Sequence, residues 1–195
     1  MHVTPKSLLA VYQTQGHRMY DGEPVTQLEH AWQCGFLAEK SGAHSALQLA
    51  SWLHDVGHLW VNAEGSPTLR GENDAHEAVA ARLLMPLFGP AVSEPVRLHV
   101  AAKRYLVSTR PTYGKKLSSD SVRSLALQGG PMSEEECAQF ELEPYFSDAV
   151  KLRVWDDLAK NASWFEISRD EAFEQLSSLM DAVASQNASL IEQRT

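Results

Sequence analysis

Apolar residues recur every three or four positions along most of the chain, which is the spacing of helices that bury one face. The clearest case is 27–41, which a capping box of Thr26 and Glu29 opens and Gly42 ends. The same periodicity predicts further helices over about 5–13, 43–56, 74–88, 93–106, 119–128, 133–140, 145–160 and 169–186.

Glycine, proline and acidic residues set the predicted ends of these helices. Gly57 is expected to end the second long helix, and Asp74 to cap the helix that follows it. Pro95 is expected in the first turn of its helix, where a missing N–H is tolerated. The stretches 16–24 and 59–73 are rich in turn residues, and we predict loops there that carry binding groups on a helical scaffold.

The fold class follows from what the pattern lacks as well as what it contains. No segment alternates strictly between apolar and polar residues, so no strands are predicted. A chain of 195 residues can bury a sizeable core within one domain. We predict an all-α, single-domain helical bundle over 1–195, with its core at about 20–160 and a C-terminal helix at about 169–186 packed on it.

Composition and net charge limit the binding partners and the cellular compartment that we expect for this chain. No run of 18 apolar residues occurs, and the N-terminus lacks an apolar signal core, so we expect no membrane span and no secretion. The two cysteines, Cys34 and Cys137, fit a reduced cytoplasm better than a disulfide scaffold. A net charge of −8 disfavours nucleic acid as a partner. The oligomeric state is left open, and a monomer is compatible with the sequence.

Histidines and aspartates form a spaced series on the predicted helices. A lone helical histidine is more often a surface or satisfied core residue, and His2, His17 and His44 are assigned to that class. The remaining series would bury unpaired polar groups from several helices, a cost that a shared metal centre removes. Imidazole and carboxylate ligands without thiolate suit iron or manganese. The candidate ligands are His30, His54, Asp55, His76, His99 and Asp156.

Basic and hydroxyl side chains accompany these candidate ligands at helical spacing. Lys103 follows His99 by four residues, and Arg153 precedes Asp156 by three, so each shares a helix face with a candidate ligand. Ser121 and Ser124 are likewise spaced by three, and His58 follows His54 by four. Cationic groups beside a metal site suit a phosphate or phosphonate, although an exposed charged face is the alternative reading.

At this point the residues resemble a known family. The order His…His-Asp…His…His…Asp is similar to the HD-domain superfamily. Longer strings resemble the mixed-valent diiron oxygenases of organophosphonate catabolism, the PhnZ and TmpB type, and the string from His99 to Ser108 is specific to that group. The match covers about 20–160 and rests on Tyr20–Glu23, Gln27–His30, Leu53–His58, His99–Ser108, Gln128–Met132 and Arg153–Asp156.

The resemblance implies roles for the candidate residues. One iron takes His30, His54, Asp55 and Asp156, and the other takes His76 and His99 and shares Asp55. Tyr20 ligates an iron in the resting state and leaves when substrate binds, and Glu23 belongs to the same mobile loop. The phosphonate is held by His58, Lys103, Ser121, Ser124 and Arg153.

The resemblance also implies a reaction at an Fe(II)/Fe(III) pair with O2 as co-substrate. The carbon–phosphorus bond of 1-hydroxy-2-(trimethylammonio)ethylphosphonate would be cleaved to glycine betaine and phosphate. The alternative substrate is 2-amino-1-hydroxyethylphosphonate, which would give glycine and phosphate. Trp32 and Trp60 could form an aromatic wall for the quaternary ammonium, or both could pack in the core.

Two other classes of function share the same ligand set. An HD-type metal-dependent phosphohydrolase would attack a phosphate ester with a metal-bound hydroxide. A catalytically silent partner-binding module is the other alternative. Its binding role would survive the loss of a metal ligand such as Asp55. Tyr20, Glu23 and the string from His99 to Ser108 favour the oxygenase over the phosphohydrolase, and the complete ligand set argues against the silent module.

Overall fold

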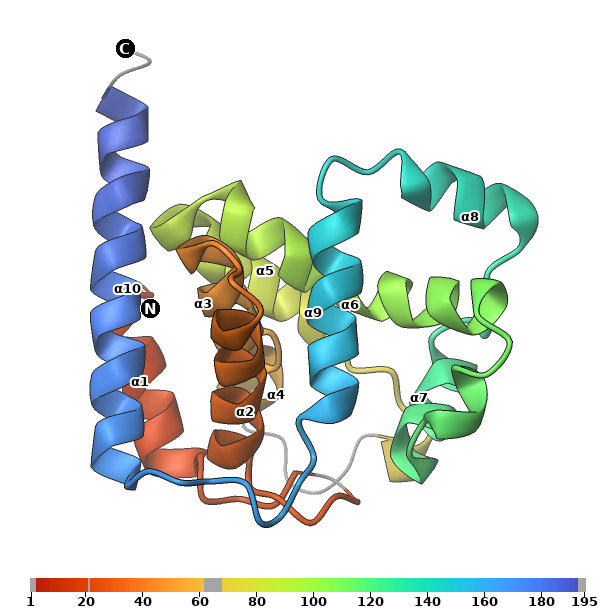
Figure 1. Cartoon of the computed structure of the whole chain (residues 1–195), viewed down its shortest axis with the longest axis horizontal. Coiled ribbons are helices and arrows are strands. Elements are labelled where there is room, and N and C mark those ends of the chain that lie inside the picture. The colour runs from red at the N-terminus through yellow and green to blue at the C-terminus, as the bar shows by residue number, and fades with distance from the viewer. Residues whose placement is uncertain (1–2, 21, 62–67, 193–195) are drawn as a thin grey trace.

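The computed structural model describes residues 3–20, 22–61 and 68–192, and within them the protein is an all-α bundle, as predicted (Figure 1). The helices are α1 (Pro5–Gln15), α2 (Gln27–Lys40), α3 (Ser45–Leu53), α4 (Val56–Val61), α5 (His76–Phe88), α6 (Pro90–Thr109), α7 (Ser119–Leu127), α8 (Glu134–Glu141), α9 (Phe146–Leu158) and α10 (Arg169–Glu192), with 3-10 turns η1 (Thr68–Arg70) and η2 (Gly114–Lys116).

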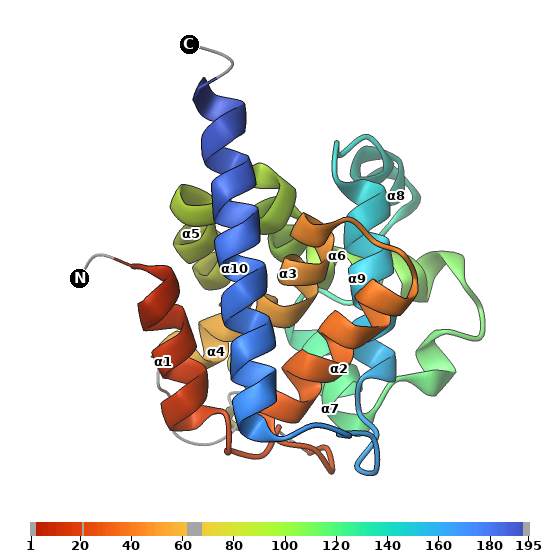
Figure 2. The ribbon, with the colours of Figure 1, turned by 60° about the vertical axis from the view of Figure 1, so that its left-hand side comes forward.

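Helix α3 lies at the centre of the bundle. Leu49, Ala50 and Leu53 have no exposed surface, and α3 packs against α2, α6, α9 and α10. Helix α10 crosses the outside of the bundle along α1 and α3, as Figures 1 and 2 show, and buries Leu176 and Met180 against the core.

Local capping explains where several helices begin. Thr26 accepts from the backbone N–H of Glu29 while the Glu29 carboxylate accepts from the backbone N–H of Thr26, which confirms the predicted capping box. Gly89, with φ of 72°, separates α5 from α6 by a single residue. A glycine suits this left-handed conformation, and it lets two long helices meet at a sharp corner.

Three predicted helix ends are wrong. Gly57 lies inside α4, and the chain leaves α3 at His54 instead. A glycine is required at position 57 because α4 approaches the start of α5 closely there. An added Cβ would lie 2.1 Å from the carbonyl oxygen of His76. Pro95 lies in the interior of α6, which begins at Pro90. Asp74 is not the N-cap residue of α5, because Ala75 takes that position, although Asp74 Oδ1 accepts from the backbone N–H of His76 at 3.4 Å.

The predicted loops also differ in part from the structure. Residues 59–61 are helical and 68–70 form η1, whereas the intervening Asn62, Ala63 and Glu64 lie outside the described residues, as does Asp21. The loop over 16–24 is present, and one isolated antiparallel bridge from Met19 to Thr26 closes it. Within the described residues, no helix is long and apolar enough to cross a membrane.

Candidate metal centre

Four helices and the break between two others deliver the six candidate ligands to one place inside the bundle. Two of the ligands sit in the break between α3 and α4, and the others come from α2, α5, α6 and α9. All are buried, with exposed fractions of 7% or less. The ligands are His30 on α2, His54 and Asp55 in the break, His76 at the first residue of α5, His99 on α6 and Asp156 on α9.

Four of these side chains form one group of converging atoms. The Nε2 atoms of His30 and His54 are 3.3 Å apart. Asp55 Oδ2 lies 3.6 Å from His30 Nε2 and 3.3 Å from His54 Nε2. Asp156 Oδ1 lies 3.5 Å from His30 Nε2 and 3.8 Å from His54 Nε2. Two imidazoles and two carboxylate oxygens therefore surround a single point.

A second group forms on the other side of Asp55. The Nε2 atoms of His76 and His99 are 3.2 Å apart. Asp55 Oδ1 lies 3.4 Å from His76 Nε2 and 3.7 Å from His99 Nε2. The two oxygens of one carboxylate thus face two different histidine pairs, which is the arrangement of a carboxylate that can bridge two cations.

The hydrogen bonds of Nδ1 determine the tautomer of the four histidines, and therefore whether Nε2 can bind a cation. Each Nδ1 lies within hydrogen-bond distance of an oxygen that can only accept, so each Nδ1 carries the proton. In the neutral tautomer each Nε2 then presents a lone pair, and the paired lone pairs repel unless a cation lies between them. The Nδ1 contacts are His30 to Ala159 O (2.8 Å), His54 to Ser51 O (2.9 Å), His76 to Asp74 Oδ1 (3.0 Å) and His99 to Val96 O (2.7 Å).

Asp156 fits the same interpretation. Its Oδ1 is buried and accepts no hydrogen bond from the described residues, whereas its Oδ2 receives the guanidinium of Arg153 at 2.8 Å. Arg153 in turn also contacts Asp157. Burial opposes ionisation of Asp156, but the charge of Arg153 outweighs it and holds the pKa of Asp156 well below its usual range. An ionised, unpaired and buried oxygen is suited to a metal.

The carboxylates also control the protonation of His54. Burial opposes a charge on this imidazole, but Asp55 and Asp156 outweigh it and raise its pKa to about 10. A proton therefore competes with any cation for His54 Nε2.

Asp74 supports the second group from outside, although the sequence prediction treated it only as a helix cap. Its Oδ1 accepts from His76, and its Oδ2 lies 2.5 Å from Nδ1 of His58. The His58 ring stacks on the His76 ring with centroids 3.8 Å apart. His58 therefore lies against a candidate ligand, and one carboxylate orients both imidazoles.

Tyr20 lies against the first group. Its hydroxyl donates to Asp55 Oδ2 at 2.9 Å, and its ring stacks on His30 at 4.0 Å between centroids. Burial and the neighbouring Asp55 charge raise the pKa of Tyr20 well above its ordinary value, which keeps the hydroxyl protonated in this arrangement. Tyr20 thus sits beside the carboxylate oxygen that faces His30 and His54.

Basic and hydroxyl side chains line a cavity that opens onto the ligands. Lys103 is 3% exposed and donates to Ser124 at 2.7 Å. Burial lowers the pKa of Lys103 to about 7, and the charges of Arg153 and Lys160 act in the same direction. His58, Lys103, Ser121, Ser124 and Arg153 all line this cavity, together with Tyr20 and Glu23.

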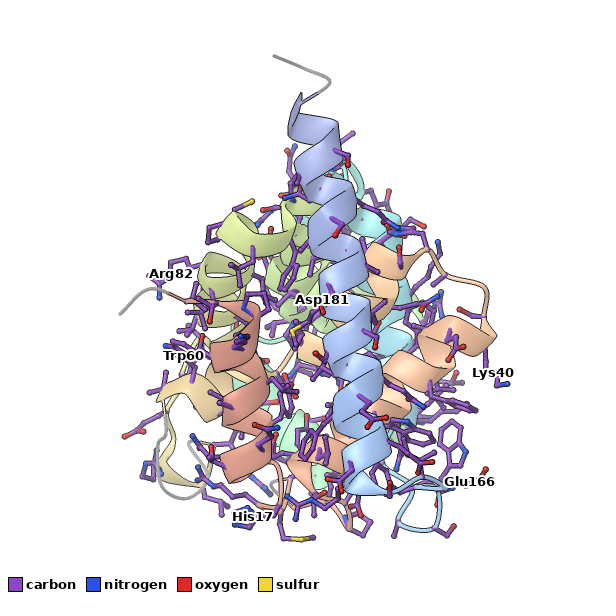
Figure 3. All side chains as sticks on the ribbon, turned by 90° about the vertical axis from the view of Figure 1, so that its left-hand side faces the viewer. His17, Lys40, Trp60, Arg82, Glu166 and Asp181 are labelled. Atoms are coloured by element: carbon purple, nitrogen blue, oxygen red, sulfur yellow. The ribbon has the colours of Figure 1, made fainter. Side chains whose placement is uncertain are left out.

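The two tryptophans do not form the aromatic wall that one prediction gave them. Neither is among the residues that line the cavity. Trp32 stacks on Phe36 and donates to Gln175 on α10. Trp60 packs against the hydrophobic core and lies on the same side of the molecule as α1 (Figure 3). Trp32 is a core residue and the half-buried Trp60 packs against the core, which was the alternative reading.

Comparison with known proteins identifies the family. No family model matches the chain. It is 46% identical over 155 residues to a hydroxymethylphosphonate dioxygenase of Gimesia maris, covering 79% of this chain and 77% of the relative. It is 39% identical over 152 residues to the glycine-betaine-forming [1-hydroxy-2-(trimethylamino)ethyl]phosphonate dioxygenase of Leisingera caerulea, covering 78% of each.

The chain belongs to the phosphonate dioxygenase family. An uncharacterised mimivirus protein, L432, is a further relative, 36% identical over 157 residues that cover 79% of this chain and 71% of the other. The chain is therefore an oxygenase, and its histidine and aspartate clusters suit a metal-dependent one.

In this dioxygenase every predicted site residue reaches the ligand cluster or the cavity beside it. The sequence prediction missed Asp74 and Lys160. Asp74 had a signal that could have been used, since it precedes a candidate ligand by two residues in Asn73-Asp74-Ala75-His76. Lys160 had one too, since it follows Asp156 by four residues within the predicted helix 145–160, the spacing that marked Lys103.

Proposed function

We propose that the protein cleaves the carbon–phosphorus bond of a 1-hydroxyphosphonate with O2 at a pair of iron ions, an Fe(II)/Fe(III) centre. The first substrate is 1-hydroxy-2-(trimethylammonio)ethylphosphonate, and the products are glycine betaine and phosphate. One C–H bond and the C–P bond break, carbon and phosphorus each gain an oxygen, and O2 is the electron acceptor. When bound, the irons supply Lewis-acid and redox chemistry.

The observation that supports a two-metal centre is the position of Asp55. One of its oxygens faces His30 and His54, and the other faces His76 and His99. A single cation would leave one histidine pair without a metal ion between its Nε2 atoms. We assign His30, His54, Asp55 and Asp156 to one ion, and His76, His99 and the shared Asp55 to the other.

The residues around the cavity would bind and orient the substrate. Lys103, held by Ser124, offers a buried ammonium, and no carboxylate of the described residues pairs with it. A phosphonate would supply the missing negative charge. It would also help Lys103 to keep the proton that burial makes easy to lose. Ser121 and His58 would add hydrogen bonds to the phosphonate. Arg153, which pairs with Asp156, would hold the phosphonate beside that carboxylate. Tyr20 would ligate iron at rest and yield to the substrate, moving with Glu23.

A second candidate substrate is hydroxymethylphosphonate. The relative with 46% identity is named for it. The only cavity-lining aromatic ring among the described residues, apart from histidines, is Tyr20, so no aromatic cage calls for a quaternary ammonium. With this substrate the same bond changes would give formate and phosphate. 2-Amino-1-hydroxyethylphosphonate, giving glycine and phosphate, and a phosphate ester are the remaining alternatives.

The test is oxygen uptake by iron-loaded protein with each hydroxyphosphonate in turn. We expect one phosphate released for each O2 consumed, with glycine betaine, formate or glycine formed according to the substrate. The same protein should leave a simple phosphate monoester intact. Phosphate release from an ester without oxygen uptake would identify a phosphohydrolase and overturn the proposal.

A further inference from the structure

Lys160 brings a second ammonium group to the cavity. It follows the end of α9 and is only 12% exposed. Its Nζ lies 3.3 Å from Ser121 Oγ on α7 and 5.6 Å from the centre of the Tyr20 ring. The position is therefore fixed by contacts with two different segments that line the cavity, and none of the six buried histidine and aspartate ligands is among them.

Among the residues that the structure describes, the charge of Lys160 has one carboxylate partner, Glu23. The Glu23 oxygen Oε1 lies 3.5 Å from Lys160 Nζ. This oxygen is buried and receives no hydrogen bond from the described residues. A buried carboxylate oxygen held only by a 3.5 Å charge contact is a weak partner, since charge-assisted hydrogen bonds are normally about 2.7–2.9 Å long.

Lys160 and Lys103 are arranged as a pair. Lys103 donates to Ser124 and Lys160 to Ser121, and the two serines lie one turn apart on α7. Each lysine is thus held by a hydroxyl beside the same cavity. Of the other cationic side chains that line the cavity, Arg153 is already matched by Asp156 and Asp157, and Arg18 donates to Gln15. A phosphonate dianion carries two negative charges, and Lys103 can match one of them.

We propose that Lys160 is a second phosphonate-positioning residue, and that Glu23 neutralises it only until the phosphonate takes its place. The inference rests on the proposed function and adds a residue that the metal chemistry does not require. The phosphonate can displace Glu23 because it carries two charges and three oxygens, and because the Glu23 contact is long. Lys160 then holds one phosphonate oxygen and Lys103 another.

A purely structural role for the pair makes the opposite prediction. If Lys160 and Glu23 only fasten the loop of Tyr20 to the end of α9, then removing either one loosens the same contact and weakens ligand binding in the same direction. If Glu23 competes with the phosphonate for Lys160, the two substitutions act in opposite directions. The sign of the Glu23 effect therefore separates the two roles.

The experiment measures binding of hydroxymethylphosphonate and of inorganic phosphate to metal-loaded protein by calorimetry without oxygen. Loss of one charge-assisted contact should raise the Kd of Lys160→Gln about tenfold or more. Lys160→Arg should retain most of the affinity, and Glu23→Gln should lower the Kd. In Lys160→Gln protein, adding Glu23→Gln should change the Kd less than about twofold. Lys151 is an exposed residue of α9, so Lys151→Gln is the control variant that removes one positive charge elsewhere on the protein.

Each outcome decides a different point. Unchanged Kd in Lys160→Gln, or weaker binding in Glu23→Gln, would overturn the role of Lys160 while leaving the proposed function intact. An equal gain from Glu23→Gln with and without Lys160 would mean that Glu23 simply repels the ligand, and would also overturn it. Failure of the unaltered protein to bind either probe would overturn the proposed function itself.

Discussion

Replacing Lys103 with methionine should make the protein more stable and its phosphonate binding weaker. The ammonium is 3% exposed, and burial lowers its pKa to about 7. Relative to an unfolded lysine near 10.4, that difference is worth about 4–5 kcal/mol at 1.36 kcal/mol per pKa unit. Methionine keeps the length of the side chain but loses the hydrogen bond to Ser124, worth about 1–2 kcal/mol.

The net gain for Lys103→Met is therefore about 3 kcal/mol, and its pH dependence has a definite sign. The folded-state pKa lies below the unfolded one, so the cost of the buried charge is complete below about pH 7. It declines as pH rises toward 10.4 and then vanishes, because lysine is neutral in both states. The variant should gain most at pH 6 and little at pH 10.

Urea unfolding followed by circular dichroism at pH 6, 8 and 10 measures this difference, with metal-loaded and chelated samples compared. Lys151→Met is the control, since it removes a charge from an exposed side chain. Equal stability of Lys103→Met and the unaltered protein at pH 6, or a gain of the same size at pH 6 and pH 10, would refute the reasoning.

Four further outcomes are expected. Asp55→Ala should lose metal from both histidine pairs, so metal analysis should find well under one ion per chain; retention of a full ion would show that the pairs are independent. Tyr20→Phe should keep its iron but change the absorption of the resting site, and an identical spectrum would exclude Tyr20 as a ligand. Gly57→Ala should destabilise by about 1–3 kcal/mol and lower metal content, because its Cβ would meet the His76 carbonyl at 2.1 Å; an unchanged melting temperature would contradict this. Metal loading at pH 7–9 should release about one proton from His54, whose pKa is about 10, as an indicator dye would report; no release would mean that His54 is neutral beforehand.

Helix content was predictable because burial of one face imposes a period on the sequence. The long helices α2, α5, α9 and α10 were found for this reason, and the capping box of Thr26 and Glu29 fixed the start of α2. Gly57 misled the prediction because a glycine can serve either a helix end or a close backbone contact. Only the packed structure shows the His76 carbonyl that excludes a Cβ there.

The candidate ligands were predictable because each lies on, or directly after, a helix whose apolar face points inward. Residues whose role depends on long-range contacts were not predictable in the same way. Lys160 acquires its neighbours Glu23 and Ser121 only when the loop before α2 and helix α7 reach the end of α9. Trp32 resembled a binding residue by its size and place, but the aromatic rings on either side of it belong to the core.

The two walls of the cavity are built from different material. Core helices and the break between α3 and α4 carry the histidine and aspartate ligands, whereas other residues that line the cavity come from short segments, including 18–20, Glu23, η1 and α7. Rigid elements hold geometry well, and surface segments tolerate replacement. Relatives could therefore diverge in the molecules they accept by exchanging this rim, and a mutant library restricted to it is the economical route to a new substrate range.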